Sequence, residues 1–288
     1  MSHSTLEPPL NLVRPSQPFA ATVLENGDLT PASADDVRHV VLDLTGSGLR
    51  YLDGQALGVV PPGVDAAGKP HRLRQYSIAS PRDGDDGAGC TVSLTVKRVV
   101  YANEAGDEVR GVCSNHLADA RPGDRVMVCG PFGKHFMMPT EPVGPLLMIA
   151  TGTGIAPFRA FLRQRARGAS VTPAFLVFGV RTSADLLYLD ELRGLLDGPD
   201  DRLVLAISRE QTNASGGRMY VGDRLVELGD TLAPLLRDQR LHVYQCGLKG
   251  MEAGVEAACQ ALLAPLDVDF AALKPELVKA RRWLVDTY

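Results

Sequence analysis

The sequence contains little that would allow covalent cross-linking or metal binding. Among 288 residues it has five cysteines, and no two of them have C-x-x-C spacing; they are Cys90, Cys113, Cys129, Cys246 and Cys259. An odd number without that spacing argues against a disulfide framework and against a zinc or iron–sulfur site. We therefore expect no metal centre in this chain.

Long apolar runs and an excess of positive charge are also missing. No apolar run approaches the roughly 20 residues of a membrane-spanning helix. The first residues, MSHSTLEPPLNLVRPSQPF, lack the charged start and apolar core of a secretory signal. The net charge is −4, whereas proteins that bind nucleic acid carry basic surfaces. These absences predict a cytoplasmic protein with no membrane span and no nucleic-acid partner.

The first half of the chain has the pattern of a small antiparallel β-barrel. With 45% hydrophobic and 22% charged residues, the chain is long enough for two ordinary globular domains. Short segments rich in β-branched and aromatic residues are separated by Gly- and Pro-rich turns, which is typical of such barrels. The expected strands are 19–24, 37–44, 73–78, 91–100 and 125–129, and the expected turns are 25–28, 61–63 and 82–87.

From about residue 142 the pattern changes to buried strands that alternate with helices. The expected strands are 146–150, 174–180, 203–207, 241–246 and 283–285, and the expected helices are 156–167, 184–196, 221–237, 251–264 and 270–281. This alternation is typical of a Rossmann-like α/β domain with a parallel sheet, which binds ligands at the carboxyl ends of its strands. With a boundary at 139–145, we predict an N-terminal extension at 1–17, a β-barrel domain at 18–141 and an α/β domain at 142–288.

A Gly-x-Gly turn is the strongest local signal. Residues 148–157 read MIATGTGIAP, a strand that runs into a turn and then a helix. Gly152 and Gly154 would let the backbone approach a pyrophosphate, and the helix N-terminus would present N–H groups to it. Pro157 suits the first turn of that helix. Taken alone, the motif fits a tight strand–helix turn without a ligand equally well.

A second signal lies in the first half, where residues 72–78 read RLRQYSI in an expected strand. The two-residue period of a strand puts Arg74 and Tyr76 on one face and Ser77 on the other. A cation beside an aromatic ring could hold a phosphate and a ring system together. An ordinary barrel strand with an exposed arginine would have the same pattern.

Together these motifs resemble the plant-type ferredoxin–NADP reductase family, in a bacterial member. The matching segments follow the family order over about 215 residues; they are RQYS (74–77), VKR (96–98), GVCS (111–114), GTGIAP (152–157), SREQ (208–211), MY (219–220), CGLKGME (246–252) and the final Tyr288. The resemblance implies an FAD-dependent oxidoreductase that exchanges electrons between NADP(H), by hydride transfer to flavin N5, and a one-electron carrier, ferredoxin or flavodoxin. We expect it to be a monomer.

The resemblance places the flavin site in the first half. It implies that Arg74 contacts the FAD pyrophosphate, Tyr76 packs on the isoalloxazine and Ser77 lies near N5, where a hydroxyl can serve the accompanying proton. Tyr101 is implied to stack on adenine, which favours FAD over FMN. Ser114 is expected to be the N-cap of a short helix whose N–H groups meet phosphate, although a cap without a ligand is equally possible. Lys97, Val112 and Cys113 complete the implied FAD-binding set.

The resemblance places the NADP(H) site in the second half. Cys246 ends an expected core strand and is implied to hold the nicotinamide against N5, although a buried cysteine more often packs as a small apolar residue. Tyr288 is implied to stack where the nicotinamide must react. The implied 2′-phosphate site offers guanidinium and hydroxyl groups, which suit a phosphate; its members are Ser208, Arg209, Arg218 and Tyr220. Thr153, Gly247 and Leu248 complete the NADP(H)-binding set.

Two departures from the family pattern affect these expectations. Asp286 stands where glutamate is usual and is one methylene shorter, so its reach as a proton relay to Ser77 is in question; the implied catalytic set is Ser77, Cys246, Asp286 and Tyr288. Arg181 stands where proline is usual. Two alternative functions stay open at this point: a reductase component that feeds an oxygenase of aromatic-acid degradation, and a non-catalytic flavin- or nucleotide-binding sensor.

Overall fold

The computed structural model describes residues 7–139, 144–168 and 172–288. By its internal contacts the chain divides into two compact units: one holds the chain up to Met137 with Arg159–Gln164, and the other holds Met138–Phe158 with Arg165–Tyr288. The expected boundary at 139–145 lies largely outside the described residues, as does the start of the N-terminal extension. In the described ranges, the helices are too short or too polar to cross a lipid bilayer.

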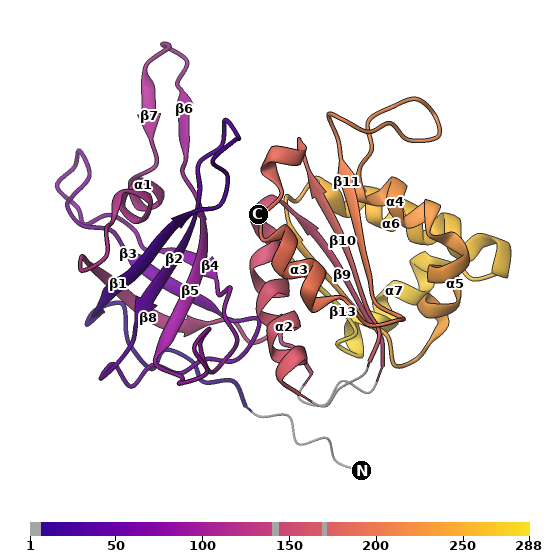
Figure 1. The fold of residues 1–288 in the computed structure, drawn as a ribbon, viewed down its shortest axis with the longest axis horizontal. Helices are drawn as coiled ribbons and strands as arrows, with labels where there is room; N and C mark the ends of the chain where they lie inside the picture. Colours follow the sequence, from indigo (N-terminus) through magenta and orange to yellow (C-terminus); the bar gives the residue numbers. More distant parts are fainter. Residues whose placement is uncertain (1–6, 140–143, 169–171) are drawn as a thin grey trace. The chain divides into compact units, whose positions relative to one another are not determined.

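The first unit is a closed antiparallel barrel (Figure 1). Its strands pair in the order β4-β3-β8-β1-β2-β5; they are β1 (Phe19–Asp28), β2 (Val37–Asp43), β3 (Ala56–Val60), β4 (Arg74–Ser77), β5 (Thr91–Lys97) and β8 (Arg125–Phe132). A bridge between Ile78 and Leu94 joins the end of β4 to β5, which removes the open edges of the sheet. The barrel predicted from the sequence is therefore confirmed.

Two smaller elements of this unit carry expected flavin-site residues. The hairpin of β6 (Val100–Ala102) and β7 (Glu108–Arg110) extends from the end of β5, and helix α1 (Val112–Asp119) follows directly. The barrel interior is filled by apolar side chains from β2, β3, β5 and β8, among them Leu42, Leu57 and Leu94, which are fully buried. This core fixes the ends of β4 and β5, from which the candidate residues project.

One turn and three strands of the barrel differ from the sequence-based prediction. Residues 25–28 were expected to be a turn, but they continue β1 and pair with β2, with Asn26 opposite Val40. The register shifts between Val23 and Glu25, so a bulge carries the polar end of the strand onward. Strands β3 and β7 were not predicted; β7 is short and largely exposed, without an apolar alternation. The single strand predicted at 91–100 is interrupted: β5 ends at Lys97, and β6 begins at Val100.

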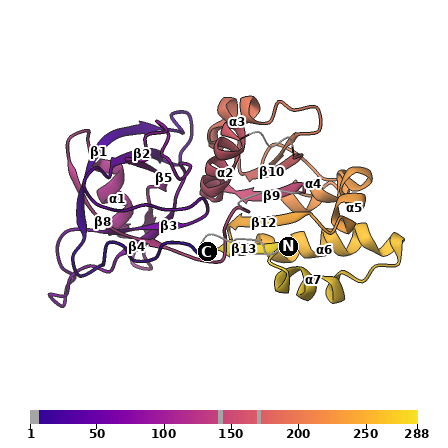
Figure 2. The same ribbon diagram turned by 90° about the horizontal axis from the view of Figure 1, so that it is seen from below.

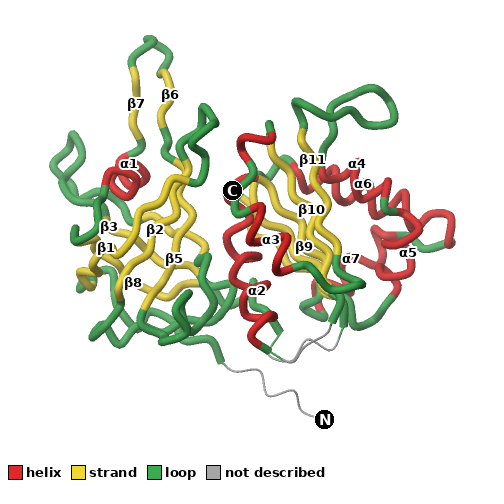
Figure 3. Tube along the Cα trace, viewed as in Figure 1, coloured by secondary structure: helices red, strands yellow, loops and turns green. Residues whose placement is uncertain are grey.

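The second unit is a five-stranded parallel sheet with helices on both faces, as expected. The strands pair in the order β11-β10-β9-β12-β13; they are β9 (Leu146–Thr151), β10 (Ala174–Val180), β11 (Arg202–Ile207), β12 (His242–Gly247) and β13 (Trp283–Thr287). Figure 2 shows α2 (Ala156–Arg167) and α3 (Leu189–Leu195) on one face, and α6 (Met251–Leu263) and α7 (Phe270–Lys279) on the other. Figure 3 shows the same layers by element type.

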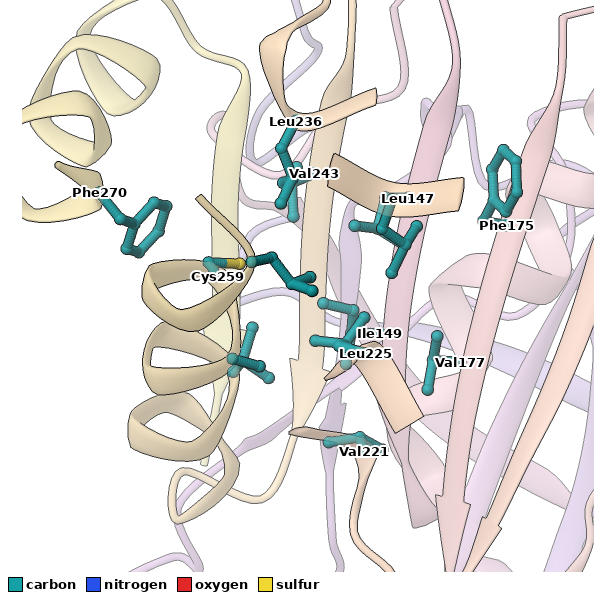
Figure 4. Close-up of a cluster of buried hydrophobic side chains, with 14 of the residues drawn as sticks. Leu147, Ile149, Phe175, Val177, Val221, Leu225, Leu236, Val243, Cys259 and Phe270 are labelled. Carbon is teal, nitrogen blue, oxygen red and sulfur yellow. The ribbon is translucent and has the colours of Figure 1, made fainter. Parts of the chain in front are cut away.

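Both faces of this sheet are buried, which explains its continuous apolar strands. On one face, Leu147, Ile149 and Val177 pack against helical residues that include Val221 and Leu225 (Figure 4). Alternate residues of the same strands, such as Met148 and Phe178, are fully buried on the other face. The central strands are thereby held rigidly, with their carboxyl ends at one edge of the sheet.

Two predicted helices are broken in the structure. The expected helix 221–237 is two helices, α4 (Val221–Glu227) and α5 (Gly229–Arg237), because the chain leaves helical geometry at Leu228. The expected helix 184–196 begins instead with a short 3₁₀ turn, Ser183–Asp185, and α3 starts only after Tyr188, which has a left-handed φ of 57°. The helices expected at 156–167, 251–264 and 270–281 are present with ends that agree within two residues.

Candidate functional site

Strand β4 carries three of the expected flavin-site residues. The Arg74 side chain is exposed, and its Nη1 lies 3.2 Å from the carbonyl oxygen of Leu73. Tyr76 and Ser77 are half-buried, opposite Leu57 and Ala56 of β3. Burial raises the pKa of Tyr76, so its hydroxyl stays protonated. The strand therefore presents an exposed cation and, two residues along, a half-buried aromatic ring.

The structure brings the start of α1 to this strand. The Cys113 thiol lies beside the Tyr76 hydroxyl and the Arg74 main-chain N–H, and burial raises the pKa of Cys113. Its Sγ is also 3.8 Å from the carbonyl oxygen of Val59. The buried Cys113 thus joins α1 to β3 and β4 through its thiol, while Val112, the first helical residue, is 46% exposed.

The expectation that Ser114 is the N-cap of this helix is wrong. The helix starts at Val112 with Gly111 as its N-cap, and Ser114 is its third residue. The Ser114 hydroxyl donates a hydrogen bond to the carbonyl oxygen of Gly111 (3.2 Å) and accepts one from the N–H of Val99 (3.2 Å). Sequence reasoning missed the cap because glycine also favours that position and leaves no side-chain signal.

The first turn of α1 is fixed by Asn115, which the sequence reasoning did not single out, and by Arg98, which it noted only as part of the segment VKR. The buried Asn115 donates from Nδ2 to the carbonyl oxygens of Val99 (2.9 Å) and Gly111 (2.8 Å). Arg98 in turn donates to Asn115 Oδ1 (2.9 Å) and forms an ion pair with Asp119 (2.7 Å). The charge pattern VKR in the sequence was noted, but its target lies 17 residues further along, which a linear motif does not reveal.

The other end of α1 is held by Asn26, in the part of β1 that was expected to be a turn. Its Nδ2 lies 2.6 Å from the carbonyl oxygen of Ala120 and 3.0 Å from that of Leu117. A helix end has unpaired carbonyl groups, which such a side chain satisfies. Both ends of α1 are therefore fixed to the barrel, so its N-terminal N–H groups have a defined position.

Lys97 and Tyr101 lie at the end of β5 and on the β6–β7 hairpin. Lys97 Nζ is 2.6 Å from Asp35 Oδ2, in a partly exposed ion pair. Tyr101 is 56% exposed, so its ring is accessible for stacking. An exposed guanidinium, a helix N-terminus and an exposed tyrosine ring form a donor set that fits a large cofactor with a pyrophosphate and aromatic ends.

In the second unit, the Gly-x-Gly turn lies at the carboxyl end of β9. Gly152 has a φ of +54°, which a residue with a side chain rarely adopts. A Cβ on Gly154 would overlap the main chain of Cys246, and one on Gly247 would overlap Thr151. The turns after β9 and β12 are thus packed backbone against backbone. Pro157 lies in the first turn of α2, as predicted.

Cys246, Asp286 and Tyr288 gather at the same edge, at the ends of β12 and β13. Cys246 is fully buried and lies opposite Asp286 in the parallel ladder, so both side chains project to one face. Tyr288 is 62% exposed, yet its hydroxyl end is enclosed. Burial raises the pKa of Tyr288 to about 12, although a hydrogen bond with Thr153 lowers this pKa in part. Cys246 and Asp286 lie near enough to raise this pKa further.

Further residues expected in the NADP(H)-binding set follow β9 and β12. Thr153, at the first turn, is 2.6 Å from the Tyr288 hydroxyl. The Leu248 side chain is 61% exposed, and its N–H donates to Thr151 Oγ1 at 2.8 Å. This edge therefore combines N–H groups, hydroxyls and an exposed apolar side chain, as a dinucleotide needs.

The expected 2′-phosphate residues also come together, in the turn after β11. A bridge between Thr212 and Arg218 closes this turn, so Arg218 returns toward Arg209. Both arginines and Tyr220 are exposed, and Ser208 is half-buried. The N–H of Tyr220 is bound by Asp223 Oδ2 at 2.7 Å, which orders the entry to α4. Asp223 also accepts a hydrogen bond from Asn213 Nδ2 at 3.0 Å. These two residues were not predicted, because they stabilise the loop and do not bind a ligand.

Comparison with known proteins agrees with this division of the site. The profile "Oxidoreductase FAD-binding domain" matches residues 31–137, and "Oxidoreductase NAD-binding domain" matches residues 148–257. The chain is 45% identical to a ferredoxin–NADP reductase of Synechocystis sp., over 97% of the chain and 70% of that protein. It is 44% identical to one of Spirulina sp. (97% and 98%) and 42% identical to leaf isozyme 1 of Arabidopsis thaliana (97% and 79%). The chain therefore belongs to the ferredoxin–NADP reductase family.

Proposed function

We propose that this chain exchanges electrons between NADP(H) and ferredoxin through FAD bound to its barrel. The observation that carries the proposal is the grouping of Thr153, Cys246 and Tyr288 at one edge of the parallel sheet. There a dinucleotide-binding turn, a thiol and an aromatic ring lie together. Full-length similarity to ferredoxin–NADP reductases supports it and does not favour an oxygenase reductase or a sensor.

The barrel residues bind the flavin. Arg74 reaches the pyrophosphate together with the first N–H groups of α1, which begins at Val112. Tyr76 packs against the isoalloxazine, and Tyr101 covers the adenine. Cys113 and Ser114 act by holding the α1 turn against the barrel. Lys97 adds a positive charge near the same turn; its ion pair with Asp35 keeps it at the barrel surface.

The parallel-sheet residues bind NADP(H). Thr153 and the Gly-x-Gly turn meet the pyrophosphate, and Gly247 and Leu248 line the approach to the nicotinamide. Arg209 and Arg218 bind the 2′-phosphate as charge-assisted donors, while Ser208 adds a hydroxyl and Tyr220 an aromatic face with a hydroxyl. The two arginines would give the enzyme its preference for NADPH over NADH.

FAD, when bound, supplies the conversion of two-electron transfer to one-electron transfer. Cys246 orients the nicotinamide, since its buried side chain cannot move freely. Tyr288 shields the reaction position until the nicotinamide displaces its ring. Ser77 holds a proton at its hydroxyl for exchange with the reacting ring. Asp286, on the same face as Cys246, carries the carboxylate for proton supply.

The proposal also includes the domain bounds, a second carrier, the oligomeric state and the cellular location. The domains run from 18 to 141 and from 142 to 288, with an N-terminal extension at 1–17. Flavodoxin is a second carrier, because a one-electron carrier needs only access to the flavin. The protein acts as a monomer in the cytoplasm.

The test is an electron-transfer assay on the purified, FAD-loaded protein. NADPH should support ferricyanide reduction much faster than NADH, and ferredoxin should then couple NADPH oxidation to cytochrome c reduction. Flavodoxin in place of ferredoxin tests the second carrier. A flavin-loaded protein that reduces ferricyanide with neither nucleotide would contradict the proposed function. Ferricyanide reduction without any ferredoxin-dependent reduction of cytochrome c would contradict only the carrier.

A further inference from the structure

The segment 246–252 is one of the family motifs, yet the proposed function leaves its last residue, Glu252, without a role. Glu252 lies in the first turn of α6, and its Oε1 accepts a hydrogen bond from the hydroxyl of Thr287, the last residue of β13. We infer that Glu252 is a positioning residue, which holds the end of β13 and thereby keeps the Tyr288 ring in place against the nicotinamide. This inference rests on the proposed function and adds to it a residue that regulates coenzyme exchange.

The turn before α6 holds the end of β13 through the main chain as well. Thr287 lies opposite Gly247 in the parallel ladder. The Tyr288 N–H donates to the carbonyl oxygen of Gly247 (3.0 Å), and the Lys249 N–H donates to the carbonyl oxygen of Tyr288 (3.2 Å). The Glu252 N–H in turn donates to the carbonyl oxygen of Lys249 (3.2 Å). The turn that ends with Glu252 therefore binds both the main chain and a side chain of this strand end.

The side-chain bond matters because β13 is an edge strand of the described sheet, with β12 as its neighbour. The side chains of Val285 and Asp286 are exposed, whereas Thr287 and Glu252 are half-buried. Chain ends with few contacts fray readily, and a hydrogen bond to a charged group is stronger than one between neutral groups. The bond between Thr287 and Glu252 therefore adds to the order that the ladder gives the last residues.

The order of these residues determines how strongly the Tyr288 ring competes with the nicotinamide. Tyr288 is 62% exposed, and its side chain is hydrogen-bonded to Thr153 (2.6 Å), so the position of the ring also depends on its main chain. A ligand that binds only after the ring has left has an apparent affinity reduced by the fraction of molecules in which the ring is away. Loss of the Glu252 contact should raise that fraction and strengthen the binding of the nicotinamide end.

The test is isothermal titration of the FAD-loaded protein with NADP⁺ and with 2′,5′-ADP, which lacks the nicotinamide. Glu252→Ala and Thr287→Val should each bind NADP⁺ about two- to fivefold more tightly and bind 2′,5′-ADP as the wild type does. Glu252→Gln keeps an acceptor oxygen and should fall between. Glu256→Ala is the matched control, because Glu256 lies one turn further along α6, is also half-buried and pairs with Lys274 (2.6 Å); it should bind both ligands as the wild type does.

A second measurement shows whether the effect passes through the ring. In the Tyr288→Ser background, Glu252→Ala should not change NADP⁺ affinity further. Wild-type NADP⁺ affinity in Glu252→Ala or in Thr287→Val would overturn the inference while the proposed function stands. Equal tightening of 2′,5′-ADP, or an effect that persists in the Tyr288→Ser background, would do the same.

One result would reach further than this residue. Wild-type NADP⁺ affinity in Tyr288→Ser alone would contradict the shielding role of Tyr288 in the proposed function, and this inference with it. Flavin absorbance and melting temperature show whether each variant is folded.

Discussion

The hydroxyl of Tyr288 lies 2.6 Å from Oγ1 of Thr153, so the last residue of the sequence is joined to the Gly-x-Gly turn. The Tyr288 N–H also donates to the carbonyl oxygen of Gly247 (3.0 Å), and the Lys249 N–H donates to that of Tyr288 (3.2 Å). Terminal residues are commonly poorly ordered unless something holds them. These three hydrogen bonds fix the ring at the edge of the sheet before a nucleotide binds.

We predict that Tyr288→Ser binds NADP⁺ more tightly, uses NADH better and turns over NADPH more slowly. The nicotinamide must displace the ring, and stacking of such a ring contributes about 0.5–1.5 kcal/mol beyond burial. Its loss would favour nicotinamide binding by that amount and retain the product longer. NADP⁺ titration and steady-state kinetics with both coenzymes would measure the change.

The matched variants separate the ring from its hydrogen bond. Tyr288→Phe keeps the ring and two main-chain bonds, so we expect kinetics close to those of the wild type. Thr153→Val removes the same hydrogen bond from the other side; because Thr153 also meets the pyrophosphate in the proposed function, this variant should weaken the binding of both coenzymes alike and leave the preference between them nearly unchanged. If Tyr288→Ser left NADP⁺ affinity, coenzyme preference and kcat unchanged, the ring would have no role in the reaction.

We predict that Arg74→Ala is purified with depleted flavin. Arg74 is exposed, so its replacement removes a phosphate contact without opening a cavity in the barrel. Arg72→Ala is the control, since Arg72 is exposed two residues earlier in the same segment. The ratio of flavin absorbance to protein absorbance after dialysis measures occupancy. Full occupancy in Arg74→Ala would exclude this arginine as an anchor of the pyrophosphate.

We predict that Arg209→Ala with Arg218→Ala weakens NADPH binding and spares NADH. Each charge-assisted bond contributes about 1.5–3 kcal/mol, which corresponds to about 10–100-fold in the dissociation constant. Arg202→Ala is a suitable control, because Arg202 begins β11 at the opposite edge of the sheet. Equal weakening of both coenzymes would show that these arginines do not read the 2′-phosphate.

We predict that His242 makes the parallel-sheet unit less stable in mild acid. Burial lowers the pKa of His242 below its usual value of 6.5, although a hydrogen bond with the main chain of Arg240 raises it in part. The folded state therefore holds His242 neutral, and the unfolded state binds more protons once the pH falls through about 6.5. Stability from this residue is present above that pH and is lost below it.

The difference between two variants isolates this effect. His242→Phe keeps a ring beside Tyr244; in the wild type the His242 and Tyr244 ring centroids are 6.5 Å apart. Between about pH 7.5 and about pH 5.5, the melting temperature of this variant should fall less than that of the wild type. His135→Gln, at an exposed site, should follow the wild type. An identical pH dependence in wild type and His242→Phe would contradict the prediction.

The sequence predicted the elements whose apolar pattern is long and local. The strand 174–180 is β10, and the helix 156–167 is α2, with the predicted bounds. Residues 25–28 misled the prediction because Asn, Gly and Asp favour turns, whereas their pairing with β2 depends on residues 38–41, which are 10 to 16 positions further along the chain. The break at Leu228 between α4 and α5 was hidden because the apolar spacing continues across it.

The candidate site likewise contains residues that a sequence motif identifies and residues whose role depends on tertiary contacts. Residues in motifs, such as Arg74, Cys246 and Tyr288, could be named from the sequence through the family resemblance. Asn26 and Asn115 could not, because their role is to bind main-chain carbonyl groups of residues distant in the sequence. The cap of α1 was misassigned to Ser114 because a serine near a helix start usually caps it.

The close packing of Gly154 and Gly247 against main chain limits how this enzyme can change its coenzyme. A side chain at either position would collide with the backbone of the neighbouring turn, so variation there is closed to stepwise evolution and to engineering. The turn after β11 is packed differently, since Arg209 and Arg218 are exposed there. Redesign toward NADH should therefore start from these two positions and leave the glycines untouched.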